Sequence, residues 1–195
     1  MSISDHSSPI ASRRRRYSTR TILIAAALGA AIGIILVPVN LVLVGFTTAF
    51  PPIASASFGL WGMAALLPLA VLRRGGSGVI GAAAAGVVLI VSPGALLMVV
   101  VMAMWGAVME MPFFMTRYRW FGWIMFTAAG VISGFISCAI SIYTYNLPSM
   151  NGGLVALICT VQIVSFVAGS LLSLVVARAL ARAGIAGGLR GDDSR

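Results

Sequence analysis

One carboxylate lies inside a long run of apolar residues, where a charge is unexpected. Glu110 belongs to the segment AMWGAVMEMPFF, residues 103–114, in a sequence with only four acidic residues. On a helix, its neighbours on the same face would be small or aromatic: Ala103, Gly106, Ala107 and Phe114. A carboxylate in lipid is costly, so we expect Glu110 to point into a helix bundle and to serve a functional site. A structural hydrogen bond or an ion pair is the alternative.

Aromatic and amide side chains could share a pocket with this carboxylate. At about 1.5 Å per residue along the expected helices, Trp61, Trp105 and Gln162 would lie near the middle of the membrane. Tyr143 and Asn146 would lie nearer the outer end, although Tyr143 is equally typical of an interfacial aromatic belt. Aromatic faces with a few polar groups suit a flat ring that is partly polar or cationic. We therefore predict an outward-opening substrate pocket from these five residues, with the carboxylate as its floor.

Residue types exclude several other chemistries. All 13 basic residues are arginine, and a chain without lysine lacks the residue that P-loop ATPases place on phosphate. The single histidine, His6, belongs to a polar N-terminal segment, so no histidine is available for a catalytic or metal centre inside the membrane. The apolar blocks hold no GxSxG or HExxH motif and no second acid to pair with Glu110. We predict that the protein is not an enzyme and needs no cofactor.

The sulfur-containing residues offer a soft-metal chemistry that we weigh and set aside. Six of the ten methionines fall between Met98 and Met115, which is conceivable for a Cu(I) relay. Without histidine or paired cysteine beside them, we expect adaptable packing against a ring instead. Cys138 and Cys159 match no CxxC or metal spacing, and we interpret them as two isolated, buried small residues. No metal site is expected.

The elements that position these side chains follow from the composition. The sequence is 60% hydrophobic and only 9% charged, which indicates an integral membrane protein. Arginines divide it into three uncharged blocks apart from Glu110, and each block is long enough for two spans of about 20 residues around a central turn. We predict an all-α membrane protein with six spans in three hairpins, at residues 21–45, 53–72, 77–91, 95–116, 121–144 and 154–178.

The arginines also predict an orientation. Every arginine falls in a terminal segment or in one of two connections, Arg73-Arg74 and Arg117/Arg119, and none falls in the three central turns. By the positive-inside rule, both termini and both arginine connections are cytoplasmic. We expect a basic cytoplasmic tail over residues 1–20, a membrane domain over 21–180 and a second cytoplasmic tail over 181–195. This basic charge suits the bilayer surface and gives little reason to expect nucleic acid.

Small residues recur at a spacing of four in the first span. Ala25, Gly29 and Gly33 form one such row, and Ala27 and Ala31 belong to a neighbouring row. Small residues at this spacing let membrane helices approach closely. The rows predict either packing within the chain or a smooth face that docks a separate membrane subunit, and the sequence leaves both open.

Three short motifs carry a resemblance to a known family. FPPIASASFGLWG leads into the second span, RRGGSG forms the first arginine connection, and MEMPFFMTRYRWFG carries Glu110 into an Arg-Tyr-Arg exit. With these motifs, the chain resembles the membrane-embedded substrate-binding (S) components of energy-coupling factor vitamin transporters. It is most similar to the YkoE type, which is linked to thiamine and its hydroxymethylpyrimidine precursor. The matching features extend from about Phe50 to Ala181.

The resemblance implies a function and a set of partners. Such components capture a vitamin from outside and work with a transmembrane coupling subunit and two ATPase subunits. It implies that Glu110 contacts the substrate and that Ala27 and Ala31 contact the coupling subunit, with Gly29 and Gly33 beside them. The alternative hypothesis is an assembly subunit of a membrane complex that binds no ligand and in which Glu110 makes a structural polar contact between helices.

Overall fold

The computed structural model describes residues 18–91, 95–144 and 146–184. Within these ranges the chain is helical and contains no strand. The basic tails that the sequence predicts therefore lie mostly outside the described residues. The elements are α1 (Thr19–Ala49), α2 (Pro51–Ala56), α3 (Phe58–Leu72), α4 (Ser77–Val88), η1 (Leu89–Val91), α5 (Ala95–Met115), α6 (Trp123–Thr144), η2 (Leu147–Ser149) and α7 (Gly152–Arg182).

The prediction of a helical, multi-pass membrane protein is confirmed. Five helical segments are long and apolar enough to cross a membrane, and the segment Ser77–Val91 is apolar but shorter. The second expected span is two helices, because the chain turns at Ser57 between α2 and α3. The Ser57 hydroxyl donates to the carbonyl of Ala54 at 2.8 Å, and the next glycine, Gly59, donates its N–H to the Ser165 hydroxyl at 2.8 Å.

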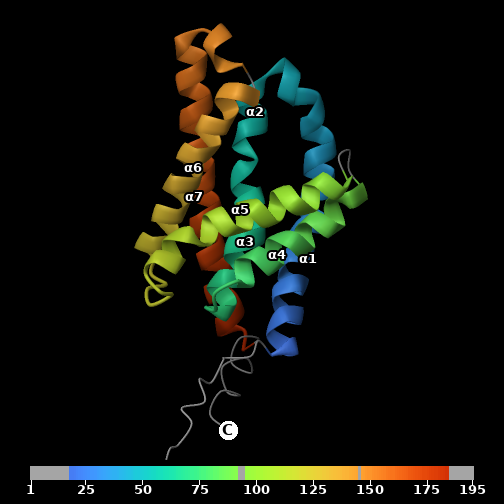
Figure 1. Ribbon diagram of the computed structural model, residues 1–195, viewed down its shortest axis with the longest axis vertical. Coiled ribbons are helices and arrows are strands. Elements are labelled where there is room, and N and C mark those ends of the chain that lie inside the picture. The colour runs from blue at the N-terminus through green and yellow to red at the C-terminus, as the bar shows by residue number, and fades with distance from the viewer. Residues whose placement is uncertain (1–17, 92–94, 145, 185–195) are drawn as a thin grey trace, which may run out of the picture.

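The helices do not all run in the same direction. In Figure 1, α1, α3, α6 and α7 follow the long axis of the molecule, whereas the α4–α5 hairpin crosses them obliquely. The short length of α4 fits this arrangement, because a helix that crosses the bundle obliquely does not have to extend from one end of the bundle to the other. Depths counted at a fixed rise per residue therefore do not apply to Trp105 and Glu110, which both lie on α5.

Two glycines of α1, Gly29 and Gly33, pack against another helix of the same chain. A Cβ atom added at Gly29 would lie 1.9 Å from the carbonyl oxygen of Gly81, and one added at Gly33 would lie 2.9 Å from Cα of Ala85. The backbones of α1 and α4 are thus in direct contact, as small residues permit. Ala27 and Ala31 are exposed instead. The structure assigns Gly29 and Gly33 to packing within the chain, whereas a partner contact at Ala27 and Ala31 stays a prediction.

Glycines also allow α7 to pack closely against two other helices. A Cβ at Gly169 would lie 2.1 Å from the carbonyl oxygen of Gly59 on α3, and one at Gly134 would lie 2.7 Å from Cα of Ile163 on α7. Because α3 and α6 both contact α7 at backbone distance, these three helices form a compact support for the side chains between them.

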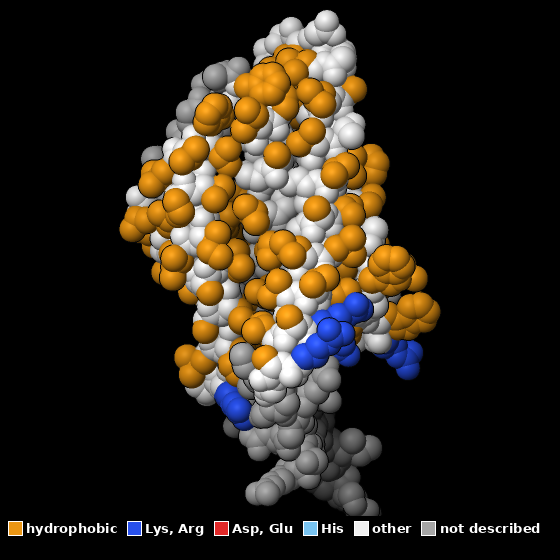
Figure 2. All heavy atoms as spheres, turned by 180° about the vertical axis from the view of Figure 1, so that it is seen from behind, with side chains coloured by type: hydrophobic (Ala, Val, Ile, Leu, Met, Phe, Trp, Pro, Cys, Tyr) orange, Lys and Arg blue, Asp and Glu red, His pale blue; other side chains and the backbone are white. Residues whose placement is uncertain are grey.

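The described arginines gather at one end of the molecule. Figure 2 shows them below a surface of hydrophobic side chains, as a membrane protein would present to lipid and water. The N-terminal end of α1 and the C-terminal end of α7 lie at this same end in Figure 1. We call it the basic end. Which side of the membrane it faces remains a prediction.

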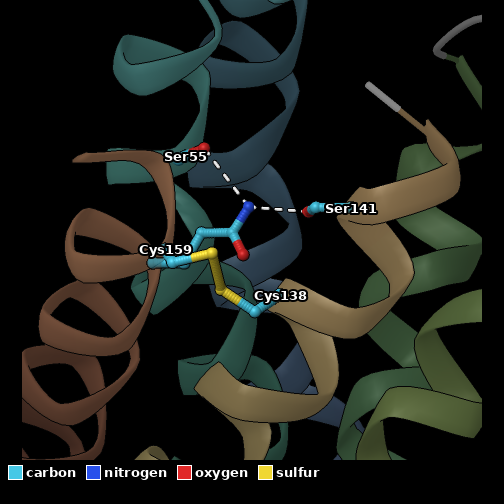
Figure 3. The surroundings of a disulfide bond; sticks show 5 residues. Ser55, Cys138, Ser141 and Cys159 are labelled. Atoms are coloured by element: carbon cyan, nitrogen blue, oxygen red, sulfur yellow. Dashed lines mark hydrogen bonds between the residues drawn. A yellow bond between two sulfur atoms is a disulfide. The ribbon is translucent and has the colours of Figure 1, made fainter. Parts of the chain in front are cut away.

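The interpretation of the two cysteines as isolated residues is wrong. Cys138 of α6 and Cys159 of α7 form a disulfide, with their Cα atoms 5.4 Å apart, and both are only partly buried (Figure 3). Cys138 lies six residues before Thr144, where α6 ends, and Cys159 lies seven residues after Gly152, where α7 begins. Two antiparallel helices joined by a short connection bring such positions together, and this symmetry about the turn is the signal that was missed.

Candidate functional site

A cavity of about 160 Å³ lies between α3, α4, α5 and α7. Its walls are almost wholly apolar and aromatic. Aromatic walls of this kind are typical of sites that bind a small organic molecule. The lining residues are Phe58, Trp61, Gly62, Ala65, Ala82, Met98, Val101, Met102, Trp105, Gly106, Met109 and Phe166.

Four aromatic rings from three helices line this cavity. The rings of Trp105 and Phe166 are stacked, with centroids 5.6 Å apart and planes at 28°, and Phe58 tilts against Phe166 at 6.1 Å. Trp61 completes the set from one turn further along α3. Trp61 and Trp105 were expected at the pocket and both line the cavity. An electron-rich ring face attracts cations and other flat rings, so the cavity is suited to a planar or cationic heterocycle.

Several lining residues were not singled out from the sequence. Phe58 and Phe166 lie on helices that do not adjoin in the sequence, and their contact depends on the α3–α7 packing. The methionines were expected only to pack against a ring, and Met98, Met102 and Met109 are all in the cavity wall. Their spacing along α5 is helical, which places them on one face and is the sequence signal for this wall.

Two glycines in the cavity wall leave space that a side chain would fill. A Cβ added at Gly62 would lie 2.7 Å from the terminal methyl of Met109 and 3.4 Å from the ring of Phe166. A Cβ at Gly106 would lie 2.9 Å from Cβ of Ala82. Any side chain at these positions would either enter the cavity or push its walls apart.

A buried polar cluster lies beside the aromatic rings. Gln162 is fully buried, and its Nε2 donates to the hydroxyl of Ser141 at 2.7 Å and, more weakly, to that of Ser55 at 3.4 Å. Figure 3 shows Ser55 and Ser141 on facing helices, next to the disulfide. Gln162, like Glu110, does not line the cavity, but it is four residues before Phe166 on α7, so about one helical turn separates it from the cavity wall. Among the described residues, the carbonyl oxygen Oε1 of Gln162 has no hydrogen-bond partner.

Glu110 is engaged by its own chain at the basic end of the bundle. The side chain is 4% exposed, its Oε2 accepts from the N–H of Gly76 at 2.8 Å, and its Oε1 accepts from the N–H of Gly78 at 2.5 Å. The hydroxyl of Tyr118 donates to the carboxylate at 3.2 Å. Gly76 and Gly78 belong to the start of α4, where backbone N–H groups have no partner inside the helix. A carboxylate there caps the helix and complements its dipole.

This geometry matches the structural alternative for Glu110 that the sequence left open. Glu110 is not among the cavity-lining residues, although Gly106 and Met109 on the same helix are. Its expected position as the floor of the pocket is therefore not what the structure shows. Direct contact with a substrate stays a prediction, which a variant can test.

The remaining expected site residues lie apart from the cavity. Tyr143 is 88% exposed near the end of α6, and Asn146 is exposed in the connection to α7, where it adopts a left-handed conformation with φ 50°. Neither lines the cavity. The exposed ring of Tyr143 is the arrangement expected of an interfacial aromatic belt.

The fold defines the class of the protein. It is similar to a solved chain described as an S component of an ECF transporter, with a TM-score of 0.79 and 17% sequence identity over 89% of this chain and 90% of that one. The chain therefore has the fold of a transporter S component. No curated protein matches it in sequence.

A family model gives the more particular assignment. Residues 20–136 match the model described as the permease component of an ABC-type cobalt transport system. The match extends over more than half of the chain, so the protein belongs to this family. It is a membrane component of a transport system, and its family is not one of enzymes.

Proposed function

We propose that this protein is the substrate-binding S component of an ATP-driven vitamin importer and that it binds thiamine or its hydroxymethylpyrimidine precursor. The observation that carries the proposal is the cavity with its four aromatic rings. Both ligands contain a flat aminopyrimidine ring, which can stack on the faces of Trp105 and Phe166. Thiamine also carries a thiazolium cation, for which aromatic faces are favourable partners.

The unpaired carbonyl oxygen of Gln162 favours a ligand that carries an amino or hydroxyl group. A buried acceptor without a donor costs about 1–3 kcal/mol, and the loss is recovered when a ligand supplies an N–H or O–H group. The Oε1 atom of Gln162 is such an acceptor, one helical turn from the cavity. The exocyclic amino group of the pyrimidine, or the hydroxymethyl group of the precursor, provides the donor.

The direct test is binding to the purified chain in detergent. We expect thiamine or hydroxymethylpyrimidine to quench tryptophan fluorescence and to give a saturable heat signal in calorimetry. Cobalt, which the family description names, is the competing substrate and is titrated in parallel. A saturable response to Co²⁺ alone, with none to either pyrimidine, would reject the proposal.

Variants link the binding to the cavity. Trp105→Leu removes a stacked ring from the cavity and is expected to weaken the calorimetric affinity for the pyrimidine by about tenfold or more, since such ring contacts contribute about 1 kcal/mol beyond buried area. Trp123→Leu is the matched control, because Trp123 is exposed on α6 and does not line the cavity. Equal losses in the two variants would contradict a site at the cavity.

The partners of such a component are a transmembrane coupling subunit and two ATPase subunits. The exposed face of α1 is our proposed contact for the coupling subunit. It carries Ala27 and Ala31, with the exposed apolar side chains of Leu23 and Ile34 beside them. Small residues flanked by larger apolar ones allow another helix to approach closely. We also propose that the basic end faces the cytoplasm, which fits the positive-inside rule.

The disulfide supports this orientation independently. Disulfides persist in oxidising surroundings and are rare in the reducing cytosol. Cys138 and Cys159 lie in the halves of α6 and α7 that are remote from the basic end. The disulfide at one end and the arginines at the other therefore support the same proposed orientation, with the disulfide end outside.

A further inference from the structure

A second cavity lies at the basic end, between the last turns of α3 and α7. It measures about 110 Å³ and is separate from the aromatic cavity, with which it shares no lining residue. Polar and apolar atoms contribute about equally to its walls, and two arginines are among the residues that line it. The lining residues are Ala70, Val71, Arg73, Leu174, Ala177, Arg178 and Ala181.

The two arginines bring positive charge to one small space. Arg73 ends α3 in a left-handed conformation with φ 50°, which directs the chain away from the helix axis, and Arg178 projects from α7. Both side chains are exposed, and the guanidinium of Arg73 also lies over the ring of Phe121, 5.8 Å from its centroid. Within the described part of the chain, no hydrogen bond or ion pair engages the guanidinium of Arg178. Guanidinium groups bind phosphate oxygens in a bidentate manner, so this pair suits a phosphate group.

The surroundings of the cavity are those of a membrane interface. On the face that Figure 2 shows, arginine side chains lie at one end of a surface of hydrophobic side chains, as is expected at a membrane interface. On the lipid side, α7 exposes Leu172 and Val175. A ligand at this depth therefore meets arginine at one end and an apolar helix surface at the other.

We propose that this cavity binds the headgroup of an anionic phospholipid, with Arg73 and Arg178 on the phosphate and the acyl chains along α7. Basic pockets between membrane helices on the cytoplasmic side are suited to such headgroups. A free phosphate would satisfy the same guanidinium groups. The exposed apolar side chains of Leu172 and Val175 on α7 favour a lipid, because acyl chains can pack against them and a free ion gains nothing from them.

Native mass spectrometry of the delipidated full chain tests the proposal. The probes are phosphatidylglycerol, phosphatidylcholine with the same acyl chains, and glycerol 3-phosphate as the free headgroup. We expect one phosphatidylglycerol to bind more tightly than the others. Arg178→Gln should weaken it about fivefold, as the loss of one basic residue near the surface implies, while Arg119→Gln at the same end should not. Arg119 is exposed and does not line the cavity.

A second variant separates a built site from general attraction to charge. Ala181→Leu keeps both arginines and places a larger side chain in the cavity wall, so it should weaken phosphatidylglycerol binding as well. Unchanged binding in Ala181→Leu, or equal losses in Arg178→Gln and Arg119→Gln, would overturn the site. Equal binding of glycerol 3-phosphate would overturn the lipid assignment. A thermal unfolding curve for each variant confirms that it is folded.

Discussion

The buried polar side chains differ in how much of their hydrogen-bonding capacity the chain itself uses. Glu110 receives three donors, from Gly76, Gly78 and Tyr118. Gln162 uses its amide nitrogen but keeps a free acceptor among the described residues. Inside a bilayer no bulk water compensates for an unmade hydrogen bond. Gln162 is therefore the stronger candidate for contact with a ligand, and Glu110 is the stronger candidate for a structural role.

Glu110→Gln separates these two roles. In the glutamine side chain an NH2 group replaces one of the two carboxylate oxygens, so one backbone N–H of Gly76 or Gly78 loses its acceptor, and we expect a loss of about 2 kcal/mol in the free energy of unfolding. Tyr118→Phe removes only the 3.2 Å hydrogen bond and should cost less. Unfolding in detergent followed by fluorescence gives both values. A loss of pyrimidine affinity in Glu110→Gln at unchanged stability would instead show that Glu110 is a ligand.

Gly62→Ala tests the size of the cavity. The added methyl group meets the end of the flexible Met109 side chain, so the fold should tolerate it, while the cavity becomes smaller. We expect weaker pyrimidine binding in calorimetry with little change in stability. Gly122→Ala is the matched control, since nothing lies within 4 Å of the added atom. Full affinity in Gly62→Ala would place the ligand elsewhere.

At the scale of elements, α1 presents two faces with different tasks. One face carries Gly29 and Gly33 and contacts the backbone of α4, and the other exposes Ala27 and Ala31. The two rows look alike in the sequence because both consist of small residues at a spacing of four. The hairpin of α4 and α5 decides which row is covered.

A pair of valine substitutions distinguishes the two faces. Gly29→Val should separate α1 from α4 and destabilise the isolated chain by about 1–3 kcal/mol, because the new atoms would overlap the backbone of Gly81. Ala27→Val should leave the isolated chain as stable as before but reduce its co-purification with a co-expressed coupling subunit. Normal co-purification of Ala27→Val would reject the proposed docking face, and unchanged stability of Gly29→Val would contradict the close helix contact.

At the scale of the whole molecule, charge and covalent chemistry divide the protein into two ends. The described arginines occupy one end, and the disulfide of Cys138 and Cys159 lies toward the other. The aromatic cavity is built where the oblique helices α4 and α5 meet α3 and α7. The proposed function as an importer requires this polarity, since an importer accepts substrate from one side and meets its ATPases on the other.

Labelling in intact cells tests the orientation. In a background of Cys138→Ser and Cys159→Ser, we expect Ser149→Cys to react with a membrane-impermeant maleimide, because Ser149 is exposed in η2 at the disulfide end. Arg119→Cys at the basic end should react only after the cells are opened. The opposite pattern would invert the proposed orientation. In the unmodified chain, a linked peptide pair under non-reducing digestion should contain Cys138 and Cys159.

The sequence by itself determined the apolar helical segments and their order, although only five of the six expected spans are long enough to cross a membrane. Arginines at regular intervals, uncharged blocks and central turns were sufficient, because the bilayer requires long apolar helices and rejects charge. The same pattern identified Trp61 and Trp105, since large aromatic residues in the middle of a span stand out. It also pointed to Glu110 as a carboxylate that faces the bundle interior and to Gln162 as a polar side chain near the middle of a span.

Only the tertiary structure decided which partners these side chains have. The helix cap at Glu110 depends on the oblique α4–α5 hairpin, and the rings of Phe58 and Phe166 meet because Gly59 and Gly169 let α3 and α7 touch. The same holds for the disulfide, which depends on the register of α6 against α7. The hydropathy pattern indicates where a residue lies along a span. It does not indicate which helix that residue contacts, because the contact depends on how the helices pack.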